Sequence, residues 1–593
     1  ESSDEDKIRF DTGGTERVVI DSNGITMSSG TVNGLGILAD TTNFEDSILI
    51  SQNASTGTLD AASNNTGLGD SVFAALTSGD NNVGIGADSL KGLTTGGANV
   101  AVGFAALEAN TTASNNVAVG FTALLANTTG SFNVAVGKDA LAANTTAAQN
   151  TAVGGVSMAS NTTGANNTAL GTSALNANTT ASNNVAVGTN ALVLNTTGSN
   201  NTAVGMQSLD ANTTGTTNTA IGKDSLGANT TGSANTGLGH NALEANTTAS
   251  DNTGVGKNAL RANTTGGENT ALGKDALSAN TTGTNNLSLG SDTMLANTTG
   301  SNNVAVGYGA LQVNSTADDN TAVGDRALFN NTTGAHNSAL GHDALKANTT
   351  GESNVAVGSQ SLDANTTGLN NVAVGRQALD NSTTGSRNVA VGTNALDANT
   401  TADHNTAVGD GALKANTTGA ANIAVGSAAG NLITTGSQNV ILGGYSGNHQ
   451  GLDVRTESDG KAVVSDGAGD IAFHNAVGTA ILAGNVDVTG DSSSANAFAL
   501  ADGAVTGLFG GGNGFSGVFI LNDFTSSGEV AMFITGGGVI TLVKQTGVNF
   551  EVGSSPASGK YGLFMDGTTV KLKSNRGASA SFRLLSLRTR TGQ

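Results

Sequence analysis

The sequence predicts an all-β protein built around a parallel β-solenoid of 17-residue coils, followed by a C-terminal β-sandwich or β-prism. Three observations lead to this fold. Residues 65–443 carry a strict 17-residue repeat, each repeat alternates short apolar runs with turn residues, and large aromatic residues are scarce.

Composition limits the kind of core that the chain can build. Its 593 residues include 85 Gly, one Pro and no Cys, and only 3% are aromatic. An apolar fraction of 37% is modest for so long a chain, so we expect a thin core of small side chains. The net charge of −21 disfavours nucleic acid as a partner, and no stretch is apolar enough to span a membrane as a helix.

The repeat is marked by one glycine per unit. Glycine recurs every 17 residues from Gly69 to Gly443, which makes 23 copies without an insertion or deletion. Asn stands four residues before each of these glycines, and Leu, Ile or Val stands directly before it. A unit of 17 residues is too short for a strand and a helix, but it can hold two strands of about five residues and two tight turns.

Within a unit, Val117 and Val119 are two residues apart and share one face of a strand. We assign that face to the core. A second apolar column, which is Leu in most copies, would face it. The predicted core residues in two representative units are Val119, Leu124, Val187 and Leu192.

The residue between the two valines is restricted in size. Ala118 and its equivalents are Ala, Gly or Ser in every copy except the last, where the residue is Ile441. Such a limit indicates close packing, either against a neighbouring chain or across the thin core. We favour a neighbouring chain at this face.

The recurring Asn and Gly have structural explanations. An Asn repeated at one place in every coil can donate to one neighbouring coil and accept from the other, and a repeated Gly supplies a positive φ or a close backbone approach. A second Asn column runs from Asn110 to Asn416, broken only by Ser382. The predicted ladder residues include Asn65, Asn116, Asn133, Asn184, Asn303 and Asn439, and the predicted turn residues include Gly69, Gly120, Gly137, Gly307 and Gly443.

The Asn-Thr-Thr element raises two further interpretations, and we favour neither. It matches the N-glycosylation acceptor pattern in copy after copy, but a turn and ladder role explains it without modification. Rows of Thr also resemble those of ice-binding solenoids. Adjacent residues of an extended chain point to opposite sides, so only one Thr per coil, such as Thr112 or Thr129, would line up outward.

The Asn-x-Val-Ala-Val-Gly strand, at residues 116–120, 133–137 and 303–307, resembles the head repeats of trimeric autotransporter adhesins and, more closely, the repeat arrays of bacteriophage tail fibres. Residues 8–27 are similar to a β-rich stretch common in phage tail-fibre proteins. The resemblance implies a left-handed parallel β-roll, three of which pack around a threefold axis, with the small-residue column at Ala118 as the packing face. We therefore predict a homotrimer.

We divide the chain into four parts. Residues 1–60 form an N-terminal β-hairpin and a lead-in or cap, and residues 61–450 form the solenoid. Residues 451–500 are a transitional β region that would cap the solenoid, because an uncapped end invites end-to-end stacking. Residues 501–593 hold short apolar runs between Gly and Ser turns and form a C-terminal all-β domain.

The last segment of the chain reverses the sign of the overall charge. From Lys560 onward the only acid is Asp566. Contact with an anionic surface is one interpretation, and solvated strand edges protected from aggregation are the favoured one. The candidate contact residues are Lys571, Lys573, Arg576, Arg583, Arg588 and Arg590.

No pattern of catalytic, metal-ligating or cofactor-binding residues stands out, so we expect a non-enzymatic protein without a cofactor. Together with the resemblance, this predicts a structural, adhesive fibre of a virion tail or of an extracellular appendage. Its partners would be further copies of itself, an adjoining virion or appendage protein, and a host cell-surface glycan or protein. A bacterial cell-surface or extracellular filament adhesin is the main alternative, and a glycan depolymerase and an ice-binding solenoid are less favoured.

Overall fold

The structure is a computed structural model. It describes residues 57–449, 452–456, 460–476 and 479–481 and, outside these ranges, the strands between Ile8 and Ser51 and between Phe498 and Arg588. The described residues form strands and turns without a helix. The chain divides into two compact units, residues 1–354 and 355–593.

Antiparallel strands precede the solenoid in the first unit. Strands β1 (Ile8–Thr12), β2 (Thr15–Asp21) and β3 (Gly24–Thr26) form one antiparallel sheet, and so the predicted hairpin is present. Strands β4 (Gly30–Val32), β5 (Leu35–Thr41) and β6 (Phe44–Ser51) form another antiparallel set. Strand β6 then pairs in parallel with β7 (Ala62–Ser63) and β8 (Thr66–Leu68), the first strand of the repeat.

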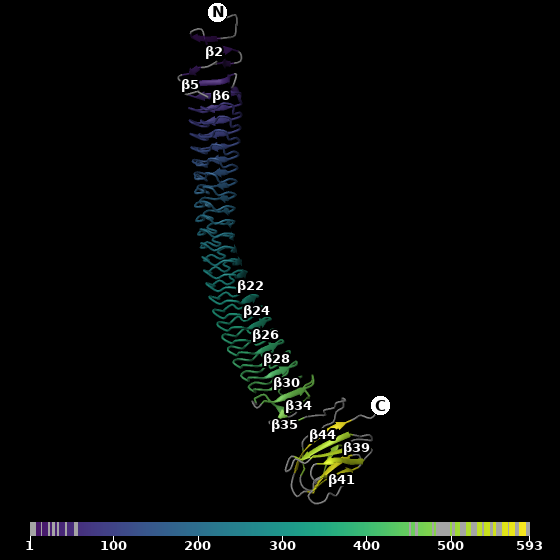
Figure 1. Ribbon diagram of the computed structural model, residues 1–593. Coiled ribbons are helices and arrows are strands. Elements are labelled where there is room, and N and C mark those ends of the chain that lie inside the picture. Colours follow the sequence, from purple (N-terminus) through teal and green to yellow (C-terminus); the bar gives the residue numbers. More distant parts are fainter. Residues whose placement is uncertain are drawn as a thin grey trace. The chain divides into compact units, whose positions relative to one another are not determined.

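The repeat forms a parallel β-solenoid, as predicted. In the first unit each coil adds one strand to a parallel sheet (Figure 1). The strands are three residues long and in register with their neighbours, so that Ala118 pairs with Ala135. The strands after β8 are β9 (Val83–Ile85), β10 (Val100–Val102), β11 (Val117–Val119), β12 (Val134–Val136), β13 (Thr151–Val153), β14 (Thr168–Leu170), β15 (Val185–Val187), β16 (Thr202–Val204), β17 (Thr219–Ile221), β18 (Thr236–Leu238), β19 (Thr253–Val255), β20 (Thr270–Leu272), β21 (Leu287–Leu289), β22 (Val304–Val306), β23 (Thr321–Val323) and β24 (Ser338–Leu340).

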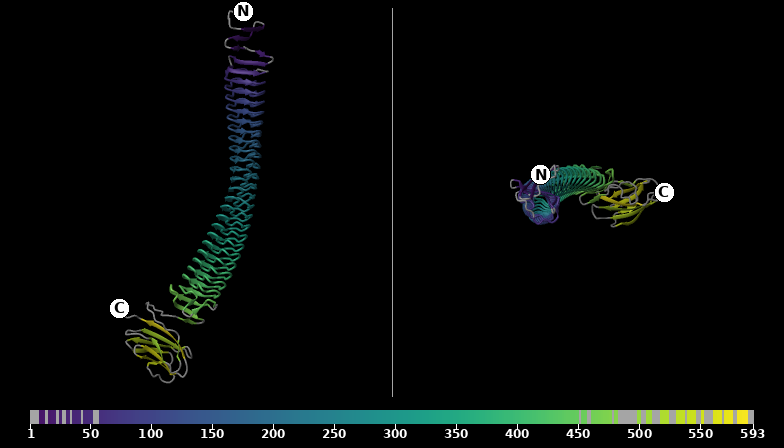
Figure 2. Two further views of the ribbon diagram at one scale, coloured as in Figure 1. Left: turned by 180° about the vertical axis from the view of Figure 1, so that it is seen from behind. Right: turned by 90° about the horizontal axis from the view of Figure 1, so that it is seen from above.

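The second unit holds the remaining coils. They contribute β25 (Val355–Val357), β26 (Val372–Val374), β27 (Val389–Val391), β28 (Thr406–Val408), β29 (Ile423–Val425) and β30 (Val440–Leu442), again parallel and in register. Figure 2 shows the stacked coils of each unit from two further directions.

The parallel sheet ends beyond residue 450. A wider last coil carries the hairpin of β31 (Asn448–His449) and β32 (Leu452–Asp453), and then β33 (Ala462–Ser465) pairs in parallel with β30. Strands β34 (Ile471–Ala476) and β35 (Thr479–Ile481) follow, both antiparallel. Antiparallel pairing thus ends the parallel sheet on this side.

One element of the predicted coil is wrong. The second apolar run, residues 121–126 in the representative coil, is not a strand but a series of turns, with positive φ at Thr122 and Leu124. Its backbone still bonds from coil to coil, because the Leu124 N–H donates to the Ala140 carbonyl at 3.0 Å. Each coil therefore has one strand of three residues rather than two of about five.

The C-terminal strands form two sheets within the second unit. A five-stranded sheet has the order β36 (Phe498–Leu500), β44 (Ala580–Arg588), β38 (Gly517–Asp523), β39 (Val530–Gly536) and β40 (Val539–Gln545). A four-stranded sheet has the order β37 (Val505–Phe509), β43 (Thr569–Asn575), β42 (Lys560–Asp566) and β41 (Phe550–Val552). The packing of these sheets into a β-sandwich or a β-prism stays a prediction.

The faces of the strand are the reverse of those predicted. Ala118 is fully buried, whereas Val119 and Val187 lie half-buried on the outward face, so their assignment to the core is wrong. Leu124 and Leu192 are fully buried.

The inner column is small because it packs against the leucine column of the preceding coil. A Cβ built on Gly254, at the inner position of β19, would lie 3.3 Å from Cγ of Leu243. The size limit therefore arises inside the coil, not from a neighbouring chain.

Candidate functional site: ladders, edges and the outward strand face

The first Asn column forms a continuous ladder within each unit. Oδ1 of Asn116 accepts the backbone N–H of Asn133 at 2.9 Å, and Nδ2 of Asn133 donates to the carbonyl of Ala147 at 2.9 Å. Oδ1 of the other predicted ladder residues, Asn65, Asn184, Asn303 and Asn439, likewise accepts the backbone N–H of the following coil. The Asn side chains are buried, so these bonds satisfy backbone groups that water cannot reach.

The ladder continues beyond the repeat at both ends. The Ser47 hydroxyl accepts the N–H of Asn65 at 2.7 Å, and the N–H of Lys461 donates to Oδ1 of Asn439 at 3.2 Å. The polar groups of the first and last ladder residues are therefore met by the flanking strands.

The second Asn column is equally buried. Nδ2 of Asn127 donates to Oδ1 of Asn110 at 3.1 Å and to the carbonyl of Gly130 at 2.9 Å. Burial of this amide in the folded coil argues against glycan attachment. Thr128 donates its hydroxyl to the Thr145 carbonyl at 3.1 Å, while the adjacent Thr129 is exposed. One Thr per coil therefore faces outward.

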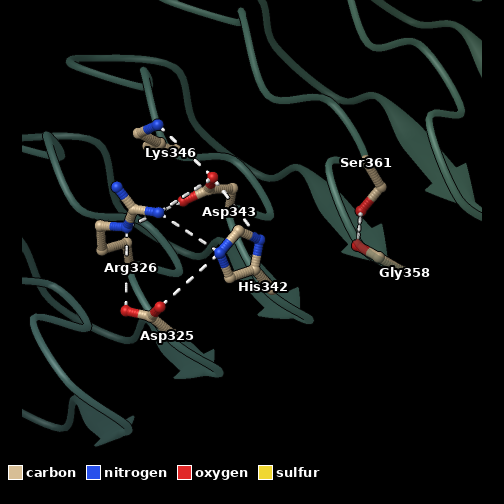
Figure 3. Close-up of polar contacts among 7 residues, drawn as sticks. All are labelled: Asp325, Arg326, His342, Asp343, Lys346, Gly358 and Ser361. Atoms are coloured by element: carbon tan, nitrogen blue, oxygen red, sulfur yellow. Dashed lines mark hydrogen bonds and ion pairs between the residues drawn. The ribbon is translucent and has the colours of Figure 1, made fainter.

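The recurring glycine combines both roles that the sequence allows. Gly120 has φ of +143° and Gly137 has +138°, and Gly69, Gly307 and Gly443 are also positive. A Cβ on Gly120 would lie 2.3 Å from the carbonyl oxygen of Gly137 in the next coil. In some coils the residue three positions later reinforces this turn, as where Ser361 donates to the Gly358 carbonyl at 2.8 Å (Figure 3).

The outward strand face carries one continuous aliphatic column. The residue directly before the turn glycine is Leu, Ile or Val in all 23 copies, and it points away from the coil. Its leucines are strongly exposed, with half of the surface of Leu68 and of Leu340 open to solvent. A contiguous exposed apolar stripe is typical of interaction surfaces.

Two further columns of residues border this outward strand face, one on each side. We call the residue before each ladder Asn the leading edge and the residue after each turn Gly the trailing edge. Asp251 and Glu268 lie on the leading edge, and Lys257 and Lys274 lie on the trailing edge of the same two coils. All four side chains are exposed.

A cluster of charges lies near the end of the first unit. Asp343 is largely buried, and its carboxylate lies 3.2 Å from Nε of Arg326 and 3.5 Å from Nζ of Lys346 (Figure 3). Nδ1 of His342 is 3.5 Å from Asp343, and Nε2 of His342 is 3.6 Å from Asp325. The carboxylates and cations compensate one another, which is typical of a structural contact between coils.

Sequence reasoning missed this cluster because its two adjacent pairs, residues 325–326 and 342–343, lie 17 residues apart in the chain. Asp325 and His342 both follow a turn glycine in successive coils, and Arg326 and Asp343 both stand one position later. Alignment of the repeats in columns would have brought these four residues together.

Three aspartates occupy one column of the second unit, at positions 363, 380 and 397. Partial burial, reinforced by the charges of Asp363 and Asp397, raises the pKa of Asp380 to about 6. A hydrogen bond from Gln377 opposes this rise in the pKa.

The predicted C-terminal cations fall on two strands. Lys571 and Lys573 lie in β43, and Arg583 and Arg588 lie in β44. Strands β43 and β44 belong to different sheets. Arg576 and Arg590 lie outside the described residues.

In the described part of the chain, no group of three or more His, Cys, Asp or Glu side chains is arranged to hold a metal ion, and no helix could cross a membrane. Comparison with family models, with curated proteins and with solved structures found no match. The outward strand face and its two edges are therefore the candidate site that the geometry itself defines.

Proposed function

We propose that this chain is a structural, adhesive fibre protein, similar to a tail fibre, in which the solenoid is a rigid spacer that presents a terminal binding domain. The observation that carries this proposal is the use of the repeat's polar groups. The ladder Asn, the first Thr of the Asn-Thr-Thr element and the turn Gly are engaged with neighbouring coils through hydrogen bonds and close backbone contacts. The polar groups of such a repeat hold each coil to its neighbours, and the stack of coils is therefore long and stiff.

Length supports the role of a spacer. Strands in a sheet lie about 4.8 Å apart, so the sixteen intervals between β8 and β24 extend the first unit by about 77 Å. A globular domain with the same number of residues would be much shorter in its longest dimension.

The outward strand face supports assembly of several copies. An aliphatic stripe along every coil is costly to leave in water, and packing copies around a common axis would cover it. We propose a homotrimer with this stripe, rather than the inner alanine column, at its centre. A trimer of such units would also be stiffer than a single solenoid.

We further propose that the protein belongs to a virion tail or to an extracellular appendage, and the length of the solenoid supports this location. Its further partners would be a host cell-surface glycan or protein and an adjoining protein of the appendage. The basic strands β43 and β44 would contribute the contact with an anionic surface. A bacterial cell-surface filament adhesin remains the alternative, because it would use the same coil.

Sedimentation of the full-length chain, together with negative-stain images, tests this proposal. We expect an elongated particle with the mass of three chains. Replacing Val187, Val204 and Ile221 together by Asp should reduce the mass to that of one chain and leave the far-ultraviolet circular dichroism unchanged. A wild-type chain that is monomeric at micromolar concentration would contradict the trimer.

Adhesion needs a separate measurement. The variant Lys571→Glu/Lys573→Glu should bind less to host cells than the wild-type chain, with the same mass and circular dichroism. If the variant and the wild-type chain bound equally, these lysines would not be part of the proposed contact.

A further inference from the structure

We infer that copies of this chain pack side by side in parallel and in register, so that Asp251 and Glu268 on the leading edge of one copy meet Lys257 and Lys274 on the trailing edge of the next. This inference rests on the assembly proposed above. It adds the direction of the copies, their register, and the residues that determine both.

The two edges lie on opposite sides of the same strands. Asp251 and Lys257 flank β19, and Glu268 and Lys274 flank β20 in the next coil. The carboxylates of Asp251 and Glu268 form no ion pair within the described part of their own chain. Lys274 is 2.8 Å from Asp275, and both lysines keep exposed ammonium groups.

Symmetry then decides which residues meet. In a ring of copies around an axis parallel to the stack of coils, the leading edge of each copy faces the trailing edge of the next at the same height. Each acid of this pair of coils thus faces a lysine. Antiparallel packing would place Asp251 and Glu268 opposite other coils.

A third leading-edge acid in the first unit, Asp319, shares its coil with a trailing-edge Asp325. In its own chain Asp325 lies 3.8 Å from Nε of Arg326 and 3.6 Å from Nε2 of His342. The cation beside Asp325 lessens the repulsion that parallel packing would otherwise create in this coil.

Exposed aromatic rings show a second, independent match between the edges. Phe104 and Phe121 stack on the trailing edge with their ring centroids 5.2 Å apart, and Nζ of Lys138 lies 6.0 Å from the centroid of Phe121. Phe132, the leading-edge residue in the coil of Lys138, is 60% exposed. In register, Phe132 of one copy lies level with Lys138 of the next, one coil from Phe121, where cation–π and ring contacts can form.

Cross-linking of paired cysteines tests the register. The chain has no cysteine, so the variant Asp251→Cys/Lys257→Cys carries one thiol on each edge of one coil. Treated with a short bis-maleimide, the full-length variant should yield covalent multimers on a denaturing gel, up to the number of chains in the assembly. The matched control is Asp251→Cys/Thr189→Cys, whose second thiol lies four coils away on the same trailing edge. It should remain almost entirely uncross-linked.

The outcomes separate this inference from the proposed assembly. Multimers from the first variant alone support parallel, in-register packing. If both variants sediment as assemblies and cross-link to the same small extent, the register is wrong but the assembly stands. If both sediment as single chains under conditions where wild type does too, the inference and the proposed trimer both fail.

Charge reversal tests the ion pairs themselves. Asp251→Lys/Glu268→Lys should raise the dissociation constant of the assembly about tenfold or more at low salt, since several pairs become repulsive at once. Adding Lys257→Glu/Lys274→Glu to the same chain should restore most of the affinity, and both effects should shrink in about 1 M salt. If the second pair of changes does not restore the affinity, the proposed contact is wrong.

Discussion

Ile441 fills the space in front of Gly430. A Cβ built on Gly430 would lie 3.0 Å from Cδ1 of Ile441, and Ile441 is fully buried. In nearly all other coils a Leu, Met or Phe stands at the position of Gly430, and Ala, Gly or Ser at that of Ile441. The single large residue of the inner column, Ile441, is thus matched by a glycine of the leucine column, Gly430.

This exchange predicts strong coupling between the two positions. Ile441→Ala should destabilise its coil by about 2–5 kcal/mol through a cavity, and Gly430→Leu by about 1–3 kcal/mol through overpacking. The double variant recreates the ordinary pair and should recover most of the loss. Gly430 has φ of +60°, close to the +51° of Leu413 in the preceding coil, so leucine can adopt this backbone. Additive effects on thermal unfolding would contradict the pairing.

The Asn ladder predicts a large penalty for losing one amide. Asn133→Ala removes the acceptor for the N–H of Asn150 and the donor to Ala147, and leaves buried backbone groups unpaired. We expect a loss of about 1–3 kcal/mol in the free energy of unfolding, seen as a lower melting temperature. The control Thr146→Ala changes an exposed side chain of the same coil and should melt like wild type.

Two glycines of neighbouring coils, Gly137 and Gly155, allow a matched test of the turn. A Cβ on Gly137 would lie 2.4 Å from the Gly154 carbonyl, at a φ of +138° that L residues rarely adopt. Gly137→Ala should therefore cost at least ~1–3 kcal/mol in strain, before the clash is added. Gly155→Ala places its Cβ in open space and should be close to neutral. Equal melting temperatures would show that the turn does not need glycine.

The period, the ladders and the turn could be predicted because each depends on a residue type that recurs at one position. The orientation of the strand could not. Val117, Ala118 and Val119 are all apolar, so alternation does not distinguish a core face from a face that another surface covers. The volume available beside Leu124 determines which face of the strand lies in the core. That volume depends on how the coils stack.

The second run illustrates another limit. Residues 121–126 hold an apolar segment of strand length, yet Thr122 and Leu124 adopt positive φ. Contacts between coils override the local preference of leucine, whose burial offsets the backbone strain. Nothing in a single unit reveals this.

The corrected faces make a prediction about two neighbouring residues. Ala186→Leu forces a large side chain into the filled interior and should destabilise the coil by about 1–3 kcal/mol. Val187→Leu changes the outward face, where Leu170 already occupies the equivalent position in the preceding coil, and should be tolerated. Circular dichroism during heating distinguishes them. If Val187→Leu lowered the melting temperature more than Ala186→Leu, the valine face would be the core face.

The aspartate column makes the second unit sensitive to pH. Burial and the neighbouring charges of Asp363 and Asp397 raise the pKa of Asp380 from 3.8 to about 6, so the folded coil prefers the protonated acid. Between these two values the folded state binds more protons than the unfolded state, and stability contributed by this group falls as pH rises. Below pH ~4 that contribution is fully present, and above pH ~6 it is lost.

Asp380→Asn should therefore raise the melting temperature of the second unit at pH 8 and change it much less at pH 4. Asn keeps the shape of the side chain but has no charge to desolvate or to repel Asp363 and Asp397. Asp380 remains partly exposed, so solvent screening should limit the gain to a few degrees. The control Asp410→Asn removes an exposed carboxylate of the same unit and should show no such difference between the two pH values. The decisive quantity is the difference between variant and wild type at each pH, because other carboxylates titrate equally in both proteins. A difference that is equal at pH 4 and pH 8 would show that the raised pKa of Asp380 does not contribute to stability.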